Sequence, residues 1–271
     1  DVARGKYSYS RRRPATYLAP RRVLNSGHHM TLELPTVPRA HLIDALAQMI
    51  RIPSVNCFGA SGVSLPPEAA MADFFERRLL ELGLDVESHV VADGRRNVWG
   101  RLKGDGKGPT ILLAGHLDTV DVDGYDAPFE PKIEDGKIFG RGSCDMKAGL
   151  AAYLETIRIL KLTKVPLAGD IIIAGVVDEE HAMSGSRHFG INGPHVDFAI
   201  VAEPSNLAIC ATHKGQICLK IKTRGVSVHS SVPERGINAI WHMSLVLNGL
   251  QALAVDLQSR TPDAMCGKPS L

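Results

Sequence analysis

Apolar residues recur three or four positions apart in several stretches of the chain, which is the spacing of an amphipathic helix. In the first stretch Leu42, Leu46 and Met49 share one helix face, and Pro53 ends the pattern. Gly83 follows another stretch and is a typical residue just beyond a helix end. The spacing predicts helices at 37–50, at 67–83, at about 145–161, near 184–189 and at 237–254.

Other runs are continuously apolar and rich in β-branched residues, namely "TILLAG" (110–115), "DIIIAGVV" (170–177) and "DFAIVA" (197–202). Such runs are typical of strands that are buried on both faces. Further strand-like runs occupy 86–91 and 97–102. Because strands alternate with helices, we expect an α/β fold with a parallel-rich sheet flanked by helices.

The pattern changes after about residue 210. Apolar and polar residues alternate over 211–225, which predicts an exposed antiparallel strand, and the amphipathic stretch 237–254 follows it. A half-exposed strand followed by a helix indicates the start of a second, α+β domain.

Composition narrows the class of protein. Hydrophobic residues make up 44% and charged residues 22% of the 271 positions, as in ordinary globular domains. No run of about 18 apolar residues occurs, so no membrane-spanning segment is expected. Five cysteines without a C-x-x-C pair argue against a disulfide scaffold and a cysteine zinc site, and favour a reducing, cytoplasmic location.

The net charge of +2 hides an uneven distribution. Residues 1–29 hold seven of the basic residues and one acid, which leaves 24 basic and 28 acidic residues for the rest. A mildly acidic body gives no reason to expect nucleic-acid binding. We interpret 1–29 as a basic disordered tail. A transit peptide or a nucleic-acid-binding arm is the alternative for such a composition.

Acidic residues and one histidine follow the predicted buried strands. His116 follows the first strand, Glu179 and Glu180 follow the second, and Glu203 follows the third. The carboxyl ends of parallel strands meet at one edge of a sheet, where ligands bind. Asp145 lies in a glycine-rich turn before the central helix. One imidazole and several carboxylates suit Zn²⁺, Mn²⁺ or Co²⁺, and a cation would offset the repulsion between the acids.

The spacing within these groups suggests which residues bind metal and which act as an orienting acid or a general base. His116 and Asp118 suit a metal ligand and an acid that accepts the other imidazole N–H, directly or nearby. Glu179 and Glu180 would point in opposite directions on an extended backbone. One of them can therefore bind metal while the other stays free as a general base.

Five ordered motifs resemble the M20 metallopeptidases, the family of acetylornithine deacetylase and succinyl-diaminopimelate desuccinylase. They are "GHLDTV", "GRGSCDMKAGLAA", "VVDEEHAMSGSRH", "AEPS" and "SVHSSVPERGINAI". The resemblance implies a two-zinc amidohydrolase, with Co²⁺ or Mn²⁺ as other possible metals. It implies that His116 and Glu203 bind one metal, that Glu180 binds the other, and that Asp145 bridges both.

The resemblance assigns three further roles. Glu179 matches the general base that activates water, and Asp118 matches the acid that orients His116. His229 matches a lid histidine that reaches an active site, often the partner subunit's, and stabilises the oxyanion. The implied domains are the N-terminal part of a metal-binding catalytic domain at 30–206 and a partial lid or dimerisation domain at 207–271, which implies a homodimer.

One family feature is missing from the sequence. The family uses a further histidine ligand near the end of its catalytic domain, and no histidine follows His242 here. We interpret the chain as a fragment of a longer product, with a truncated paralogue as the alternative. The expected substrates are N-acyl amino acids or small peptides. The alternative function is an inactive fragment or pseudoenzyme that keeps a single structural metal.

Overall fold

The computed structural model describes residues 37, 39–58, 68–92 and 94–271. The predicted tail at 1–29 lies outside the described residues. The chain divides into two units, Asp1–Glu203 and Pro204–Leu271, and each is described by itself.

The first unit is built on a five-stranded sheet in the order β1-β2-β6-β3-β7. Its strands are β1 (Asp85–Ala92), β2 (Arg95–Leu102), β3 (Ile111–His116), β6 (Ile171–Val176) and β7 (Phe198–Val201). β3 pairs in parallel with both β6 and β7, whereas β2 pairs antiparallel with both β1 and β6. The α/β class is therefore confirmed, and the sheet is mixed.

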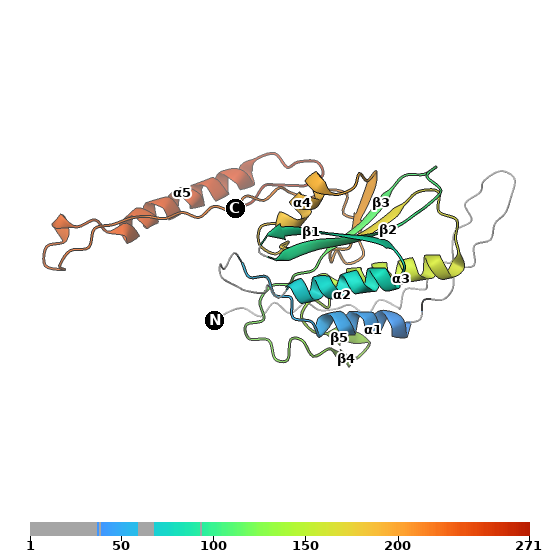
Figure 1. The fold of residues 1–271 in the computed structure, drawn as a ribbon. Helices are drawn as coiled ribbons and strands as arrows, with labels where there is room; N and C mark the ends of the chain where they lie inside the picture. Colours follow the sequence, from blue (N-terminus) through green and yellow to red (C-terminus); the bar gives the residue numbers. More distant parts are fainter. Residues whose placement is uncertain (1–36, 38, 59–67, 93) are drawn as a thin grey trace. The chain divides into compact units, whose positions relative to one another are not determined.

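Helices cover both faces of this sheet (Figure 1). α2 (Glu68–Glu81) and α3 (Lys147–Thr163) pack on one face, and α1 (Arg39–Ile50) packs against α3 one layer further out. The short α4 (Ser184–Asn192) covers the other face, against β1, β2 and β6.

Alternate side chains of the central strands enter two separate cores, which explains their continuous apolar runs. Leu113 and Ile173 join the core between the sheet and α1, α2 and α3. Leu112 and Ile172 join the smaller core beneath α4, together with Trp99. The prediction of strands buried on both faces is thus confirmed for 110–115 and 170–177.

The same prediction is wrong for 197–202. Phe198, Ile200 and Val201 in β7 are 64%, 55% and 57% exposed. β7 lies at the edge of the sheet, and α3 reaches its backbone through the Tyr153 hydroxyl, which donates to the carbonyl of Ile200 at 2.9 Å, without covering the exposed side chains. An apolar run therefore identified the strand correctly but not its surroundings.

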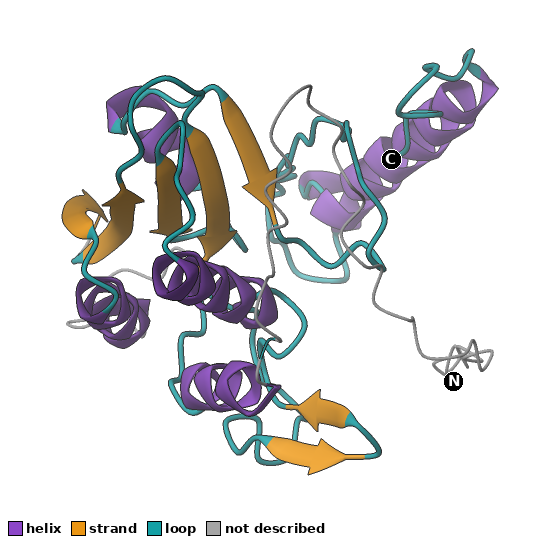
Figure 2. Ribbon diagram, turned by 90° about the vertical axis from the view of Figure 1, so that its right-hand side faces the viewer, coloured by secondary structure: helices purple, strands orange, loops and turns teal. Residues whose placement is uncertain are grey.

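A small antiparallel hairpin, which the sequence pattern did not predict, stands apart from the main sheet beside α1 (Figures 1 and 2). Its strands are β4 (Lys132–Glu134) and β5 (Lys137–Phe139). Ile138 packs against the larger core, and the other side chains of the hairpin are exposed.

The second unit contains the 3₁₀ turn η1 (Pro233–Arg235) and the long helix α5 (Ala239–Ser259). Asn238 begins α5, since its side-chain oxygen accepts hydrogen bonds from the backbone N–H groups of Ile240 and Trp241. The strand predicted at 211–225 is wrong, because these residues form no strand in the structure. An alternating segment becomes a strand only beside a partner, and the described residues offer it none.

By length and composition α5 could cross a membrane, and it is the one such helix among the residues searched. Core helices of globular proteins have the same length and composition. Large apolar side chains of α5 are exposed, including Trp241 at 69%.

Candidate metal centre

The predicted site residues of the first unit gather at the carboxyl edge of the parallel strands. His116 is the last residue of β3, Glu179 and Glu180 follow β6, and Glu203 follows β7. Asp145 lies in the turn before α3, where its peptide bond to Met146 is cis. The structure thus brings these strand ends and this turn together, as the sequence predicted.

His116 is almost fully buried and its two ring nitrogens face different groups. Nε2 lies 3.0 Å from Asp145 Oδ1, 3.6 Å from Glu203 Oε1 and 3.9 Å from Glu179 Oε2. Nδ1 lies 2.9 Å from the backbone oxygen of Asp118. If Nδ1 carries the proton and donates it to this carbonyl, Nε2 has a free lone pair directed at the acids.

Asp118 supports the site in two ways. Its backbone oxygen fixes the His116 ring, while its carboxylate Oδ1 is 3.6 Å from Nδ1. The carboxylate instead accepts the backbone N–H groups of Glu179 at 3.1 Å and Glu180 at 3.0 Å. The fully buried Asp118 therefore holds the imidazole and both glutamates in one arrangement.

Charge repulsion and burial shift the pKa values in this cluster. Burial, with the negative charge of Asp145 nearby, raises the pKa of Glu203 to about 7. Burial also raises the pKa of Glu180, and the hydrogen bond to His116 lowers the pKa of Asp145. For His116, burial lowers the pKa, but the hydrogen bonds to Asp118 and Asp145 outweigh it and raise that pKa to about 11. The cluster thus favours a positive charge at its centre.

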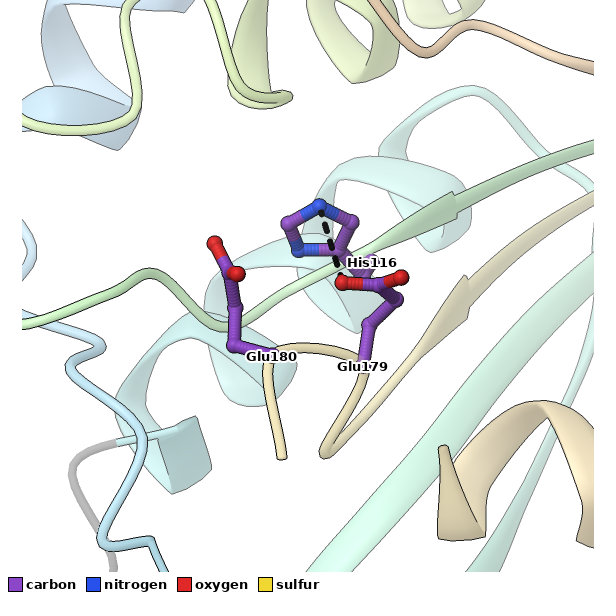
Figure 3. A group of neighbouring side chains, drawn as sticks. All are labelled: His116, Glu179 and Glu180. Carbon is purple, nitrogen blue, oxygen red and sulfur yellow. Dashed lines mark ion pairs between the residues drawn. The ribbon is translucent and has the colours of Figure 1, made fainter. Parts of the chain in front are cut away.

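The donor set fits a divalent metal. Two groups of side chains have ligand atoms within 4.8 Å of one another, namely His116 with Asp145 and Glu203, and His116 with Glu179 and Glu180. Figure 3 shows Glu179 and Glu180 reaching toward His116 from neighbouring positions on one turn. One imidazole nitrogen and carboxylate oxygens are suitable ligands for zinc and similar ions.

Several buried polar residues around the cluster were missed by the sequence analysis. Asn56 donates to Asp118 Oδ2 at 2.7 Å and to Asp178 Oδ1 at 3.1 Å. Arg95 donates to Asp178 at 2.8 Å, and Glu68 accepts the backbone N–H of Asp178 at 2.9 Å. These residues lie in loops and at element ends far apart in the sequence, so no periodic pattern marks them.

His229 lies in the second unit, near the start of η1. Its Nδ1 is 2.7 Å from the hydroxyl oxygen of Ser231, and both side chains are exposed. Its predicted role at the active site stays a prediction.

Residues 112–265 match the family model described as "Peptidase family M20/M25/M40". This match covers more than half of the chain and includes all seven predicted site residues. The chain belongs to the M20 family.

Curated relatives include acetylornithine deacetylase of Shigella sonnei (strain Ss046), which is 38% identical over 70% of this M20 chain and 49% of its own length. Acetylornithine deacetylase of Proteus mirabilis (strain HI4320) is 33% identical over 85% of this chain and 58% of its own length. The chain thus spans about half the length of these relatives.

Solved structures share the fold. A tripeptidase from Staphylococcus aureus superposes with a TM-score of 0.56 at 20% identity, over 78% of this chain and 56% of its own. The aminopeptidase PepT from Bacillus cereus gives a TM-score of 0.51 at 21% identity, over 77% and 56%.

Proposed function

We propose that the protein hydrolyses an amide bond in N-acyl amino acids or small peptides, using two zinc ions in its intact active site. The observation that carries this proposal is that the carboxylates of Asp145, Glu203 and Glu179 converge on the Nε2 atom of His116. The names of the curated relatives, both acetylornithine deacetylases, support the substrate class.

The chain's own residues divide the ligands between two positions. His116, Asp145 and Glu203 would hold one metal, since their ligand atoms lie within 4.8 Å of one another. For the second metal the family resemblance implies Asp145 and Glu180, and Glu180 lies in the other group around His116. When bound, the metals would polarise the acyl carbonyl and lower the pKa of a water molecule; Co²⁺ or Mn²⁺ could replace zinc with the same ligands.

Proton transfer falls to Glu179. Its carboxylate is partly exposed and lies beside His116 Nε2, so it can take a proton from the attacking water. The same carboxyl group then passes the proton to the leaving amine. His229 would donate a hydrogen bond to the oxyanion. The family resemblance implies that such a histidine often reaches the active site of the partner subunit.

The first test counts metal ions in the purified chain and in two single variants. Glu179→Ala should keep the metal content and lose about 10²–10⁴-fold in turnover, the usual contribution of a general base. Glu180→Ala should lose metal. Metal loss in Glu179→Ala with retention in Glu180→Ala would show that the two roles are exchanged.

One observation favours a second candidate, a chain that holds a single structural metal without catalysis. Both candidate ligand groups in the described part of the chain share the same histidine, His116. In that case chelation would lower the melting temperature of a chain with no activity, and elemental analysis would give one metal per chain.

We also propose that the protein forms a homodimer through residues 207–271. The exposed apolar side chains of α5, with Trp241 and Leu245 each at 69%, support an interface there. The few cysteines of the sequence, with no C-x-x-C pair, are the basis for proposing a reducing cytoplasmic setting as well. Sedimentation analysis of Trp241→Glu against the unaltered chain tests the dimer.

A further inference from the structure

We propose that Asn56 is a positioning residue of the metal centre, whose side-chain amide joins Asp118 to Asp178 and thereby sets the directions of Glu179 and Glu180. The inference rests on the proposed function and adds a residue to it. Asn56 lies outside the segment matched by the family model and belongs to none of the motifs of the sequence analysis.

The turn that carries both glutamates begins in an unfavourable backbone conformation. Asp178 has φ of +63°, in the left-handed region that costs energy for residues other than glycine. Its carboxylate is held by Ser184 at 2.5 Å, Arg95 at 2.8 Å and Asn56 at 3.1 Å. These contacts stabilise the backbone conformation of Asp178, which sets the direction of the chain at Glu179 and Glu180.

Asn56 connects this turn to the acid that holds the glutamates. One amide nitrogen, Nδ2, donates to Asp118 and to Asp178, which lie 62 and 122 positions away in the sequence. Asp118 in turn accepts the backbone N–H groups of Glu179 and Glu180. A shift of Asn56 would therefore reach both glutamates through Asp118 and through Asp178.

The orientation of the amide is fixed by its own environment. Asn56 is 2% exposed, and its Oδ1 accepts the backbone N–H of Phe58 at 2.7 Å. Its backbone N–H donates to Thr119 at 2.8 Å, next to Asp118. With Oδ1 already engaged, Nδ2 faces the two acids, and an amide can donate there without adding a charge.

The chain contains a matched control. Asn97 is fully buried and braces the same turn, because its Oδ1 accepts the N–H of Val177 and its Nδ2 donates to the carbonyl of Gly185. As a buried amide it makes two side-chain hydrogen bonds, and both of them go to backbone groups. Asn97→Ala therefore reproduces the loss of stability without the loss of contact to Asp118.

The test titrates Co²⁺ into the unaltered chain, Asn56→Ala and Asn97→Ala, and follows binding by visible absorption and by calorimetry. Thermal denaturation should give both variants a lower melting temperature than the unaltered chain. Only Asn56→Ala should bind Co²⁺ about 10–100-fold more weakly, as for other residues that orient metal ligands, with a changed absorption spectrum. Asn56→Ser, which keeps one hydroxyl donor, should fall between Asn56→Ala and the unaltered chain.

Equal affinity and identical spectra in all chains would overturn the inference while leaving the proposed function intact. Failure of both Asn56 variants to fold, with Asn97→Ala folded, would also overturn it, since Asn56 would then serve stability alone. If the unaltered chain binds no Co²⁺, the proposed function fails and the inference fails with it.

Discussion

At the scale of single residues, Glu68 shows how the buried network affects stability. It is fully buried, its Oε1 accepts the N–H of Asp178, and Arg95 lies 3.5 Å from its Oε2. Burial, joined by the negative charge of Asp118, raises the pKa of Glu68 from 4.5 to about 7. The folded chain therefore holds this proton more tightly than the unfolded chain does.

This difference predicts a pH dependence. Because the folded pKa exceeds the unfolded one, the contribution of Glu68 to stability is fully present below about pH 4.5 and is lost as pH rises to about 7. Glu68→Gln keeps an acceptor for the Asp178 N–H but cannot ionise. Relative to the unaltered chain, its free energy of unfolding should rise by on the order of 2 kcal/mol between pH 5 and pH 7.5. Urea denaturation at both pH values measures this, and a difference independent of pH would contradict it.

At the scale of elements, α3 supports both neighbouring helices through lysines. Lys147, at its start, donates from Nζ to the carbonyls of Met49 at 3.0 Å and Ile52 at 2.9 Å, at the end of α1. Lys161, in its last turn, donates to the carbonyls of Leu82 and Gly83 just beyond α2. Such carbonyls lack partners within their own helix.

The two lysines differ in burial, which predicts different costs of removal. Lys147 is fully buried, and burial lowers its pKa to about 7, whereas the bonds of Lys161 are exposed. Lys147→Ala leaves the carbonyl of Ile52 without this donor and that of Met49 with only the N–H of Ile52, beside a new cavity. It should lower the free energy of unfolding by about 2–4 kcal/mol. Lys161→Ala exposes its carbonyls to water and should cost less than about 1 kcal/mol. Thermal denaturation compares them, and equal losses would be inconsistent with this account.

At the scale of the whole molecule, the candidate metal centre belongs to the first unit. Its ligands come from the ends of β3, β6 and β7 and from the turn before α3. A metal that binds only the folded state stabilises it, by about 2.7 kcal/mol at a free concentration 100 times its Kd. The elements that supply ligands should share this stabilisation.

Hydrogen exchange with and without Zn²⁺ tests the location of the centre. Peptides covering 111–118, 145–150 and 176–185 should exchange more slowly with metal, whereas those covering α5 should not change in a monomer. Glu203→Ala should reduce the difference, because one ligand is removed from the first metal position. Slower exchange confined to α5 would place the metal in the second unit.

Much of the fold and of the candidate site follows from local patterns. The order of the helices and of the main-sheet strands in the first unit is predictable because apolar spacing reports burial on one face or on two. The convergence of His116, Glu180 and Glu203 is predictable because parallel strands end at the same edge. Both predictions need only neighbours in the sequence and a general rule of sheets.

Other features depend on partners that local patterns do not identify. The exposure of β7 and the absence of a strand at 211–225 were decided by which elements stand beside them.

The sequence by itself determined the fold class, the order of the main-sheet strands and of the helices in the first unit, and the edge where the acids gather, because each depends on short-range spacing. Only the tertiary structure decided how the glutamates are held. Asn56, Glu68 and Arg95 reach Asp178 across 122, 110 and 83 positions of the chain. A polar residue in a loop carries no periodic signal, and its role becomes visible only when folding brings its hydrogen-bonding partners to it.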